Sequence, residues 1–319
     1  MKSFQFKRTQ RKYKTAYRIS NWPTYEAGLR QRGSVTVWLS EDARKAWCHT
    51  GQRNPGGRRL YSNAAIETFW TIRMIYGLAL RQTEGFIRSL FELAHVGLPV
   101  PDHSTVSRRV RNLGKVPMLP RNSKGPIHLL VDSSGLQIHV GNACMPPKRR
   151  AWRKIHIAVD RETGDVLAAE LAASQARDAA RVPAVLSQVE SELASFCADG
   201  AYDKEPVHEA AQAHSPDRRT RVIIPPQKGA LLSPEKATAM QDRNRHIRAI
   251  DRIGRRAWHL LSGFTRRSKV ENAFYRYKAI VGREMTARTL AGQRVEARIG
   301  CRILNTMASL GMPKSYPIA

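Results

Sequence analysis

Hydrophobic positions follow a helical period in one part of the chain and a strand period in another. Between residues 63 and 113, apolar side chains recur every three or four positions, which predicts helices over 63–80, 82–94 and 104–113. From residue 127, short aliphatic runs replace this pattern and predict strands at 127–140, 152–159, 166–172, 195–200 and 221–225. Amphipathic helices are expected between the later strands, at 178–193 and 204–213.

The change of pattern divides the chain into five parts. We predict a basic N-terminal segment at 1–59, a helical domain at 60–114, a linker at 115–126, an α/β domain at 127–310 and a tail at 311–319. In the first part, six apolar residues predict a small core, namely Trp22, Leu29, Val35, Val37, Trp38 and Leu39. The basic tail and the Gly- and Arg-rich stretch 51–59 leave contact with a polyanion backbone open.

The third predicted helix, 104–113, separates apolar from polar positions. Val106, Val110 and Leu113 are expected to face inward, with Asp102 or Ser104 as the N-terminal cap. The outer side carries Thr105, Ser107, Arg108, Arg109, Arg111 and Asn112. A series of short helices whose last member is basic is similar to a helix-turn-helix, a DNA-binding motif. The connection at 94–103 is longer than the usual turn of about 3–4 residues in that motif. A plain helical bundle is the alternative.

The order of elements after residue 126 indicates the fold. Three hairpin-linked strands are followed by a helix, a strand, a helix, a strand and a final helix at 264–278. This is the order of a ribonuclease-H-like fold, an α/β fold whose mixed sheet is flanked by helices. Asp160 and Asp165 are explained by the turn between the second and third strands.

The final helix carries an acid between basic residues. At about 100° per residue, Arg267, Glu271, Phe274 and Lys278 share one stripe of this helix. A neighbouring stripe is apolar and consists of Val270, Ala273, Tyr277 and Val281. Glu271 is therefore expected at the edge of the buried face.

Three acids occupy positions that converge in such a fold. Asp132 lies in the middle of the first strand, Asp199 ends the fourth strand and Glu271 lies on the final helix. Carboxylates gathered in one place repel one another unless cations neutralise them, and their hard oxygens select Mg²⁺ or Mn²⁺. Two such ions can cut a phosphodiester without a nucleophilic side chain. Asp203 is predicted to cap the following helix, with a role as a fourth carboxylate left open.

The charge of the chain identifies the partner class. The formal net charge is +28, from 54 Lys and Arg against 26 Asp and Glu, which is typical of a nucleic-acid-binding protein. The charge is uneven, because residues 127–202 hold 8 basic and 9 acidic residues and are nearly neutral. A neutral block inside a basic chain is what a carboxylate site within a phosphate-binding surface requires.

The cysteine pattern and the apolar runs restrict the class and the location. Cys48, Cys144, Cys197 and Cys301 are widely spaced, which argues against a zinc site and a disulfide framework. The chain lacks a leader-like start and an apolar run of about 18 residues, so we expect a cytoplasmic protein that does not enter a membrane.

Several motifs together resemble one known family. The stretches are Leu-Leu-Val-Asp-Ser-Ser-Gly-Leu around Asp132, Ala-Asp-Gly-Ala-Tyr-Asp around Asp199, and Arg-x3-Glu-x6-Lys over Arg267, Glu271 and Lys278. They resemble the DDE transposases of bacterial insertion sequences, specifically insertion sequence family five. The likeness runs from about residue 17 to 310, and Phe264 stands where the family signature has tyrosine.

The resemblance implies a function and roles for these residues. A transposase of this kind binds the terminal inverted repeats of its element as double-stranded DNA, cuts the ends with Mg²⁺ and joins the freed 3′ hydroxyls to target DNA. Asp132, Asp199 and Glu271 are then catalytic metal ligands, whereas Arg267 and Lys278 hold DNA phosphates. Because two ends must be paired, a dimer is expected in the synaptic complex.

Alternatives remain at three points. A non-catalytic repressor that binds the same DNA is one alternative function, and another ribonuclease-H-like nuclease, such as a resolvase or retroviral-type integrase, is a second. The spacing Arg-x3-Glu-x6-Lys argues against that nuclease. Trp258 could stack on a flipped DNA base, although core packing is the commoner role of a tryptophan.

Overall fold

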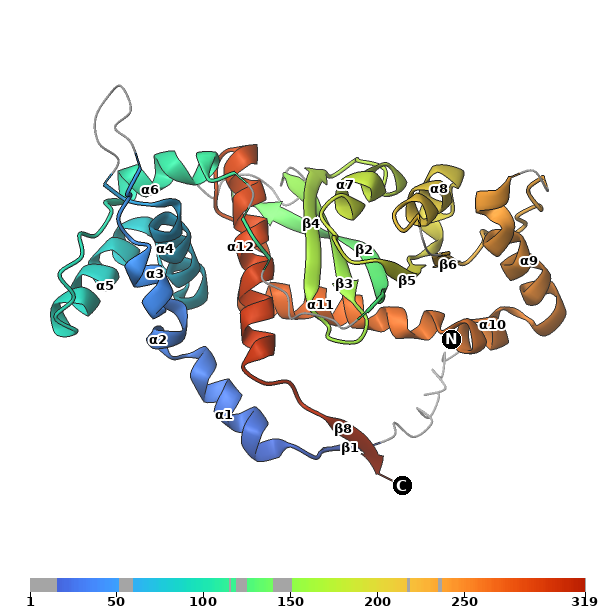
Figure 1. The fold of residues 1–319 in the computed structure, drawn as a ribbon, viewed down its shortest axis with the longest axis horizontal. Coiled ribbons are helices and arrows are strands. Elements are labelled where there is room, and N and C mark those ends of the chain that lie inside the picture. Colours follow the sequence, from blue (N-terminus) through green and yellow to red (C-terminus); the bar gives the residue numbers. More distant parts are fainter. Residues whose placement is uncertain are drawn as a thin grey trace, which may run out of the picture.

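The computed structural model describes residues 16–51, 60–114, 116–118, 125–139, 151–216, 219–234 and 237–318. The predicted basic tail before residue 16, the Gly- and Arg-rich stretch 52–59 and most of the predicted linker lie outside these residues. A mixed sheet lies on one side of the molecule and a group of helices on the other, with a long C-terminal helix between them (Figure 1). No helix in the described ranges is long and apolar enough to span a membrane.

The sheet has six strands in the order β4-β3-β2-β5-β6, with β7 also paired to β2. The strands are β2 (Ile127–Ile138), β3 (Trp152–Asp160), β4 (Val166–Ala173), β5 (Leu193–Cys197), β6 (Arg221–Ile223) and β7 (Glu284–Met285). β2, β3 and β4 form an antiparallel meander, whereas β5, β6 and β7 run parallel to their neighbours. The prediction of an α/β fold with a mixed, helix-flanked sheet is confirmed.

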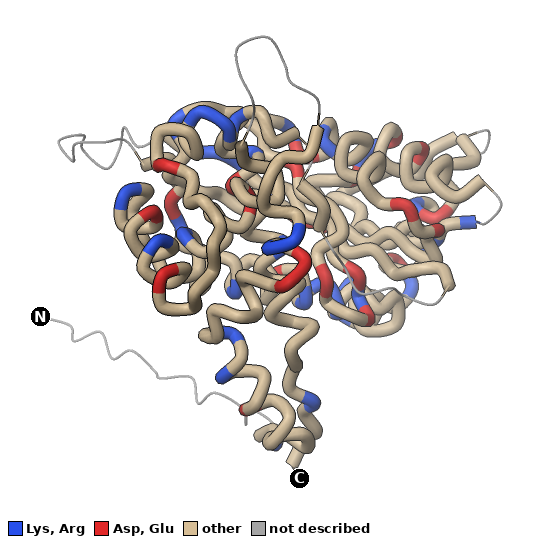
Figure 2. Tube along the Cα trace, turned by 60° about the vertical axis from the view of Figure 1, so that its left-hand side comes forward, with Lys and Arg blue, Asp and Glu red and all other residues tan. Residues whose placement is uncertain are grey.

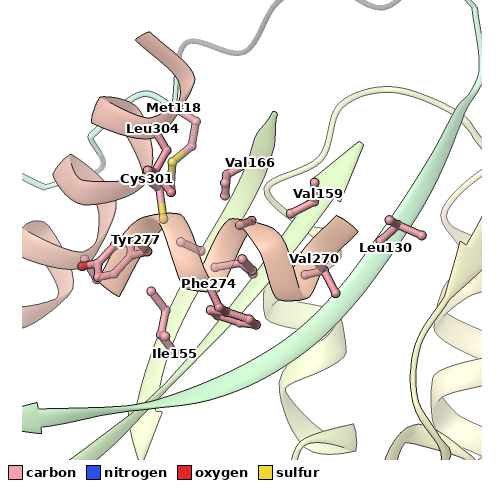
Figure 3. Packing of buried hydrophobic residues seen from close by; sticks show 14 of the residues in the cluster. Met118, Leu130, Ile155, Val159, Val166, Val270, Phe274, Tyr277, Cys301 and Leu304 are labelled. Atoms are coloured by element: carbon pink, nitrogen blue, oxygen red, sulfur yellow. The ribbon is translucent and has the colours of Figure 1, made fainter. Parts of the chain in front are cut away.

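Side chains of β2 alternate between two cores, one on each face of the sheet. Leu129 and Val131 pack with α7 (Val182–Leu186) and α8 (Glu205–Ala213). Leu130 points to the opposite face, where α11 (Ser268–Ile280) contributes Val270 and Phe274 to the core (Figure 3). Both faces of β2 are apolar here because both are covered, and the aliphatic run at the start of β2 follows from this.

The helix α8 agrees with the helix expected at 204–213, but other helices between and after the strands differ from the prediction. The helix expected at 178–193 is reduced to a 3₁₀ turn, Ala179–Arg181, and the short α7, and Leu193 belongs to β5. The hydrophobic pattern also did not predict α9 (Gln241–Ile253) or α10 (Arg255–Ser262). The residues that α9 buries include Asp242, Asn244 and His246, so its buried face lacks an apolar period.

The helical region consists of α4 (Asn63–Tyr76), α5 (Leu80–Leu93) and α6 (His103–Arg109), which continues as a 3₁₀ turn over Val110–Asn112. Val106, Val110 and Leu113 are buried, as predicted. Asp102 caps α6, because its Oδ1 accepts hydrogen bonds from the backbone N–H groups of Ser104 and Thr105, each at 2.9 Å.

The C-terminal helix α12 (Leu290–Ser309) belongs to both regions. Ala297, Cys301 and Leu304 contribute to the core shared with α11 and the sheet. Val295, Ile299, Ile303 and Met307 contribute to the core of the helical region. Because apolar residues cover two sides of this helix, it holds α4–α6 against the sheet.

Only part of the predicted N-terminal core forms. The segment contains β1 (Ala16–Ile19), α1 (Trp22–Arg32), α2 (Val35–Trp38) and α3 (Glu41–Lys45), and β1 pairs antiparallel with β8 (Ser315–Ile318). Trp38 is buried, but Trp22 is 51% and Leu29 is 39% exposed, so their assignment to a core was wrong. The helix α1 buries only Gly28. A Cβ atom at this position would lie 2.5 Å from the carbonyl oxygen of Leu310.

Candidate active site

Two of the predicted acids lie at the same edge of the sheet. β2 and β5 are adjacent and parallel, and Leu130 is paired with Cys197. Asp132 and Asp199 each follow two positions later, so the register brings them to neighbouring places. The Asp132 carboxylate accepts a hydrogen bond from the backbone N–H of Ser133 at 2.8 Å, and Asp199 accepts one from Ala201 at 2.9 Å.

The third acid reaches this edge from α11 through an arginine. Glu271 lies in the first turn of α11, and Arg267 is the residue that precedes the helix. The Arg267 guanidinium donates from Nη1 to Oδ2 of Asp132 and from Nη2 to Oε1 of Glu271, both at 2.6 Å. The side chain of Asp132 is 14% exposed and that of Glu271 is 56% exposed. The single Arg267 guanidinium therefore neutralises both the buried carboxylate of Asp132 and the exposed carboxylate of Glu271.

Burial controls the protonation of Asp132. It raises the pKa of this carboxyl above its ordinary value, and the negative charge of Asp199 acts in the same direction. The hydrogen bond from Ser133 and the Arg267 charge oppose the rise in pKa. The Arg267 charge thus offsets only part of the cost of burying this carboxylate.

The carboxylates fit a divalent ion by type, but Arg267 lies between two of them. Asp132, Asp199 and Glu271 offer hard oxygen donors, as Mg²⁺ and Mn²⁺ require. Within the described ranges, no group of three or more His, Cys, Asp or Glu side chains lies close enough to hold a metal ion. Binding a metal at all three acids thus requires the guanidinium to leave Asp132 or Glu271.

The last turn of α11 and the segment that precedes the helix make further side-chain contacts. Lys278, in the last turn, donates from Nζ to Oγ of Ser134 on β2 at 2.6 Å. Phe264 packs against Trp258 and His259, with ring centroids 5.8 and 4.8 Å apart, and the Arg267 guanidinium lies 5.6 Å from its ring. Aromatic packing therefore holds the segment that leads to Arg267.

Comparison with known families decides the classification. Two families, both described as a transposase DDE domain, match residues 30–141 and 123–306. The second match spans more than half of the 319 residues. The chain belongs to the DDE transposase family. Among solved structures, a piggyBac transposase synaptic complex with hairpin DNA is similar at a TM-score of 0.37 and 11% identity, over 88% of this chain and 74% of that chain.

The transposase has a buried polar network behind the two aspartates, which the sequence analysis missed. Tyr202, 1% exposed, follows Asp199 by three positions, and its hydroxyl interacts with Ser133, next to Asp132. His156 lies 3.5 Å from this hydroxyl and 3.9 Å from Asp178. The tyrosine in Ala-Asp-Gly-Ala-Tyr-Asp was the available signal, because it lies on the strand-to-helix turn that also carries Asp199.

Asp203 was wrongly predicted as a helix cap. Lys204 is the N-terminal cap of α8, and Asp203 is instead buried beside two basic side chains. It accepts from Nε of Arg243 at 3.0 Å and lies 3.4 Å from Nε2 of His208. The charge of Arg243 stabilises a carboxylate that the strand-to-helix turn leaves buried. These contacts give Asp203 a structural role in this transposase.

The residues predicted to contact DNA from α6 fall into two groups. Ser107, Arg108 and Arg111 are exposed. Thr105 is half-buried, and Arg109 donates to the carbonyl of Tyr61 and, at 2.8 Å, to Oδ1 of Asn63. Arg109 therefore ties the end of α6 to the start of α4.

Trp258 lies inside the α/β core of the transposase. It is 3% exposed, and its Nε1 donates to Nδ1 of His246 at 3.1 Å. A base cannot stack on a ring that is covered on both faces. The observed burial favours core packing over base stacking.

Proposed function

We propose that this DDE transposase binds the terminal inverted repeats of an insertion sequence of family five, cleaves the DNA at these ends and joins them to target DNA. The supporting observation is the linkage of Asp132 and Glu271 through Arg267, with Asp199 two residues after the end of the adjacent parallel strand β5. Three carboxylates around one edge of a ribonuclease-H-like sheet suit metal-assisted phosphodiester chemistry.

The chain's own residues have separate tasks in this proposal. Asp132, Asp199 and Glu271 are the ligands of two Mg²⁺ or Mn²⁺ ions, which when bound activate a water or 3′ hydroxyl and stabilise the leaving oxygen. Arg267, once released from the carboxylates, pairs with a DNA phosphate, as does Lys278. The Ser133–Tyr202 contact keeps the two aspartate-bearing segments together.

The partner that suits the chain is double-stranded DNA. Lys and Arg are spread over the helical region and the α/β region alike (Figure 2), and the net charge of +28 favours a polyanion. Synapsis of two ends requires two active sites, so a dimer on DNA is part of the proposal. In the helical region, the exposed residues predicted to contact DNA are Ser107 and Arg108 of α6 and Arg111 of the 3₁₀ turn that follows it.

Nicking of inverted-repeat DNA tests the proposal. The single changes Asp132→Asn, Asp199→Asn and Glu271→Gln should each reduce nicking with Mg²⁺ or Mn²⁺ by at least about 10³-fold, since each removes a charged ligand. DNA binding should persist. Asp251→Asn, at an exposed carboxylate of α9, is the matched control and should nick normally. A wild-type protein that binds the ends with either ion present but leaves them intact would instead be a repressor.

A further inference from the structure

A basic cleft lies between the helical region and the start of α12. It has a volume of about 420 Å³ and lies between α4, α6 and the connection from β7 to α12. Arg73, Arg111, Arg288 and His103 line it, together with hydroxyl-bearing residues such as Ser107. None of the described lining residues is an Asp or Glu. The cleft thus presents positive charge and hydroxyl donors to one small volume.

The wall formed by the β7–α12 connection is fixed by a buried carboxylate. Glu296, 4% exposed, accepts hydrogen bonds from the backbone N–H groups of Thr286 and Ala287 at 2.8–3.0 Å. Gln293 donates from Nε2 to the carbonyl of Ala287 at 3.0 Å. These bonds set the position from which the exposed Arg288 extends. A preformed wall loses little conformational entropy when a ligand binds.

Two donors that belong to the lining residues lack acceptors. The Arg73 guanidinium lies 4.7 Å from the Trp70 ring centroid and donates from Nη1 to Oγ1 of Thr286 at 2.7 Å. Its Nε and the Nε1 of Trp70, a residue that is 2% exposed, are buried without a hydrogen-bond partner among the described residues. An unmade bond at a buried donor costs about 1–3 kcal/mol. Burial also lowers the pKa of Arg73, which an anion would offset.

We propose that this cleft binds a backbone phosphate of DNA. The inference rests on the proposed function, because that function supplies DNA as the polyanion, and it adds a contact site whose lining includes none of the three carboxylates. Phosphate oxygens are acceptors only, which matches a lining of arginines and hydroxyls. Because Arg111 comes from the helical region and Arg288 from the β7–α12 connection, DNA bound here contacts both parts of the molecule.

The salt dependence of DNA affinity tests the cleft. The change is Arg111→Gln with Arg288→Gln, and the matched control is Arg44→Gln with Arg252→Gln, at two exposed arginines that do not line the cleft. Affinity for inverted-repeat duplex is measured by fluorescence anisotropy at several salt concentrations. Each lost phosphate contact should reduce the slope of log K against log salt by about 0.9. Because the cleft binds one backbone phosphate, we expect the slope of the cleft variant to be reduced by about 0.9 and that of the control to equal the wild-type slope.

Two outcomes would overturn the assignment. Equal slopes for the cleft variant and its control would show that only net charge matters. A second arm compares thermal unfolding in inorganic phosphate with that in chloride at equal ionic strength. Stabilisation by phosphate that the cleft variant loses, with no change in its DNA slope, would identify a free phosphate compound as the occupant instead of DNA.

The nicking assay keeps this test separate from the proposed function. If the wild-type protein does not nick its ends with Mg²⁺ or Mn²⁺, the transposition proposal fails, but the slope comparison still reports on the cleft. If nicking succeeds and the slopes are equal, the cleft assignment alone fails.

Discussion

Arg267 donates a 2.6 Å hydrogen bond to Asp132, a residue 135 positions earlier in the chain. The same guanidinium contacts Glu271 at 2.6 Å, so one side chain supplies the counter-charge for two predicted metal ligands. A divalent cation needs the same carboxylate oxygens. We therefore expect Arg267 and the cation to compete, and an arginine released by metal would be free to pair with a phosphate.

Arg267→Gln should tighten Mn²⁺ binding to the DNA-free protein. Removing the competing charge is expected to lower Kd roughly tenfold, which corresponds to about 1.4 kcal/mol. Isothermal titration calorimetry measures this directly. Arg266→Gln is the matched control, because Arg266 is the exposed neighbour and should leave Kd unchanged. Unchanged or weaker Mn²⁺ binding in Arg267→Gln would contradict the competition.

Gly300→Ala should destabilise the protein, whereas Gly85→Ala should stabilise it. A Cβ at Gly300 of α12 would lie 2.5 Å from the ring of buried Tyr277 on α11. Overpacking of this kind costs about 1–3 kcal/mol. Gly85, inside α5, has nothing within 4 Å of its Cβ position, so alanine should add about 0.5–1 kcal/mol through helix propensity. Urea unfolding of both variants tests the close α11–α12 contact, and a stabilised Gly300→Ala would refute it.

Arg302→Ala should weaken the attachment of the helical region to α12. Arg302 and Glu67 of α4 form an ion pair at 2.6 Å with side chains only 15% and 14% exposed. Leaving one member of such a pair unpartnered costs about 3 kcal/mol. The double change Arg302→Met with Glu67→Met should cost less than either methionine change alone, because it leaves no unpaired charge. Additive losses in urea unfolding would show that the two residues are not coupled.

The stability of the protein should fall on acidification because of His156. Burial lowers the pKa of this imidazole from 6.5 to about 4, so the unfolded state binds its proton first. Neutral His156 therefore contributes on the order of 2 kcal/mol to the free energy of unfolding. This contribution is complete above pH 6.5 and is lost as the pH falls towards 4.

His156→Gln should reduce this pH dependence. The difference in unfolding free energy between wild type and variant is measured by urea denaturation from pH 7 to pH 4.5. An NMR titration of the wild-type His156 resonance provides a second measurement, with an expected midpoint near 4. A midpoint near 6.5 would show that His156 is not desolvated in the folded protein.

The sequence by itself determined the strands and most of the helical region. β2, β3 and β4 were predictable because two covered faces require short aliphatic runs, and α6 because Val106, Val110 and Leu113 recur with a helical period. Among the acids predicted for the site, Asp132 was singled out because a carboxylate in the middle of an apolar strand is costly without a partner.

Only the tertiary structure decided how the parts join and what surrounds the acids. α12 was missed in the sequence because it packs on two sides, and α9 because its buried residues are polar. The bridge from Arg267 to Asp132, the burial of Trp258 and the cleft between Arg111 and Arg288 each depend on segments distant in the chain. Local periodicity records which face of an element is covered. It does not record which element covers that face, because packing partners are selected by shape and charge across the whole fold.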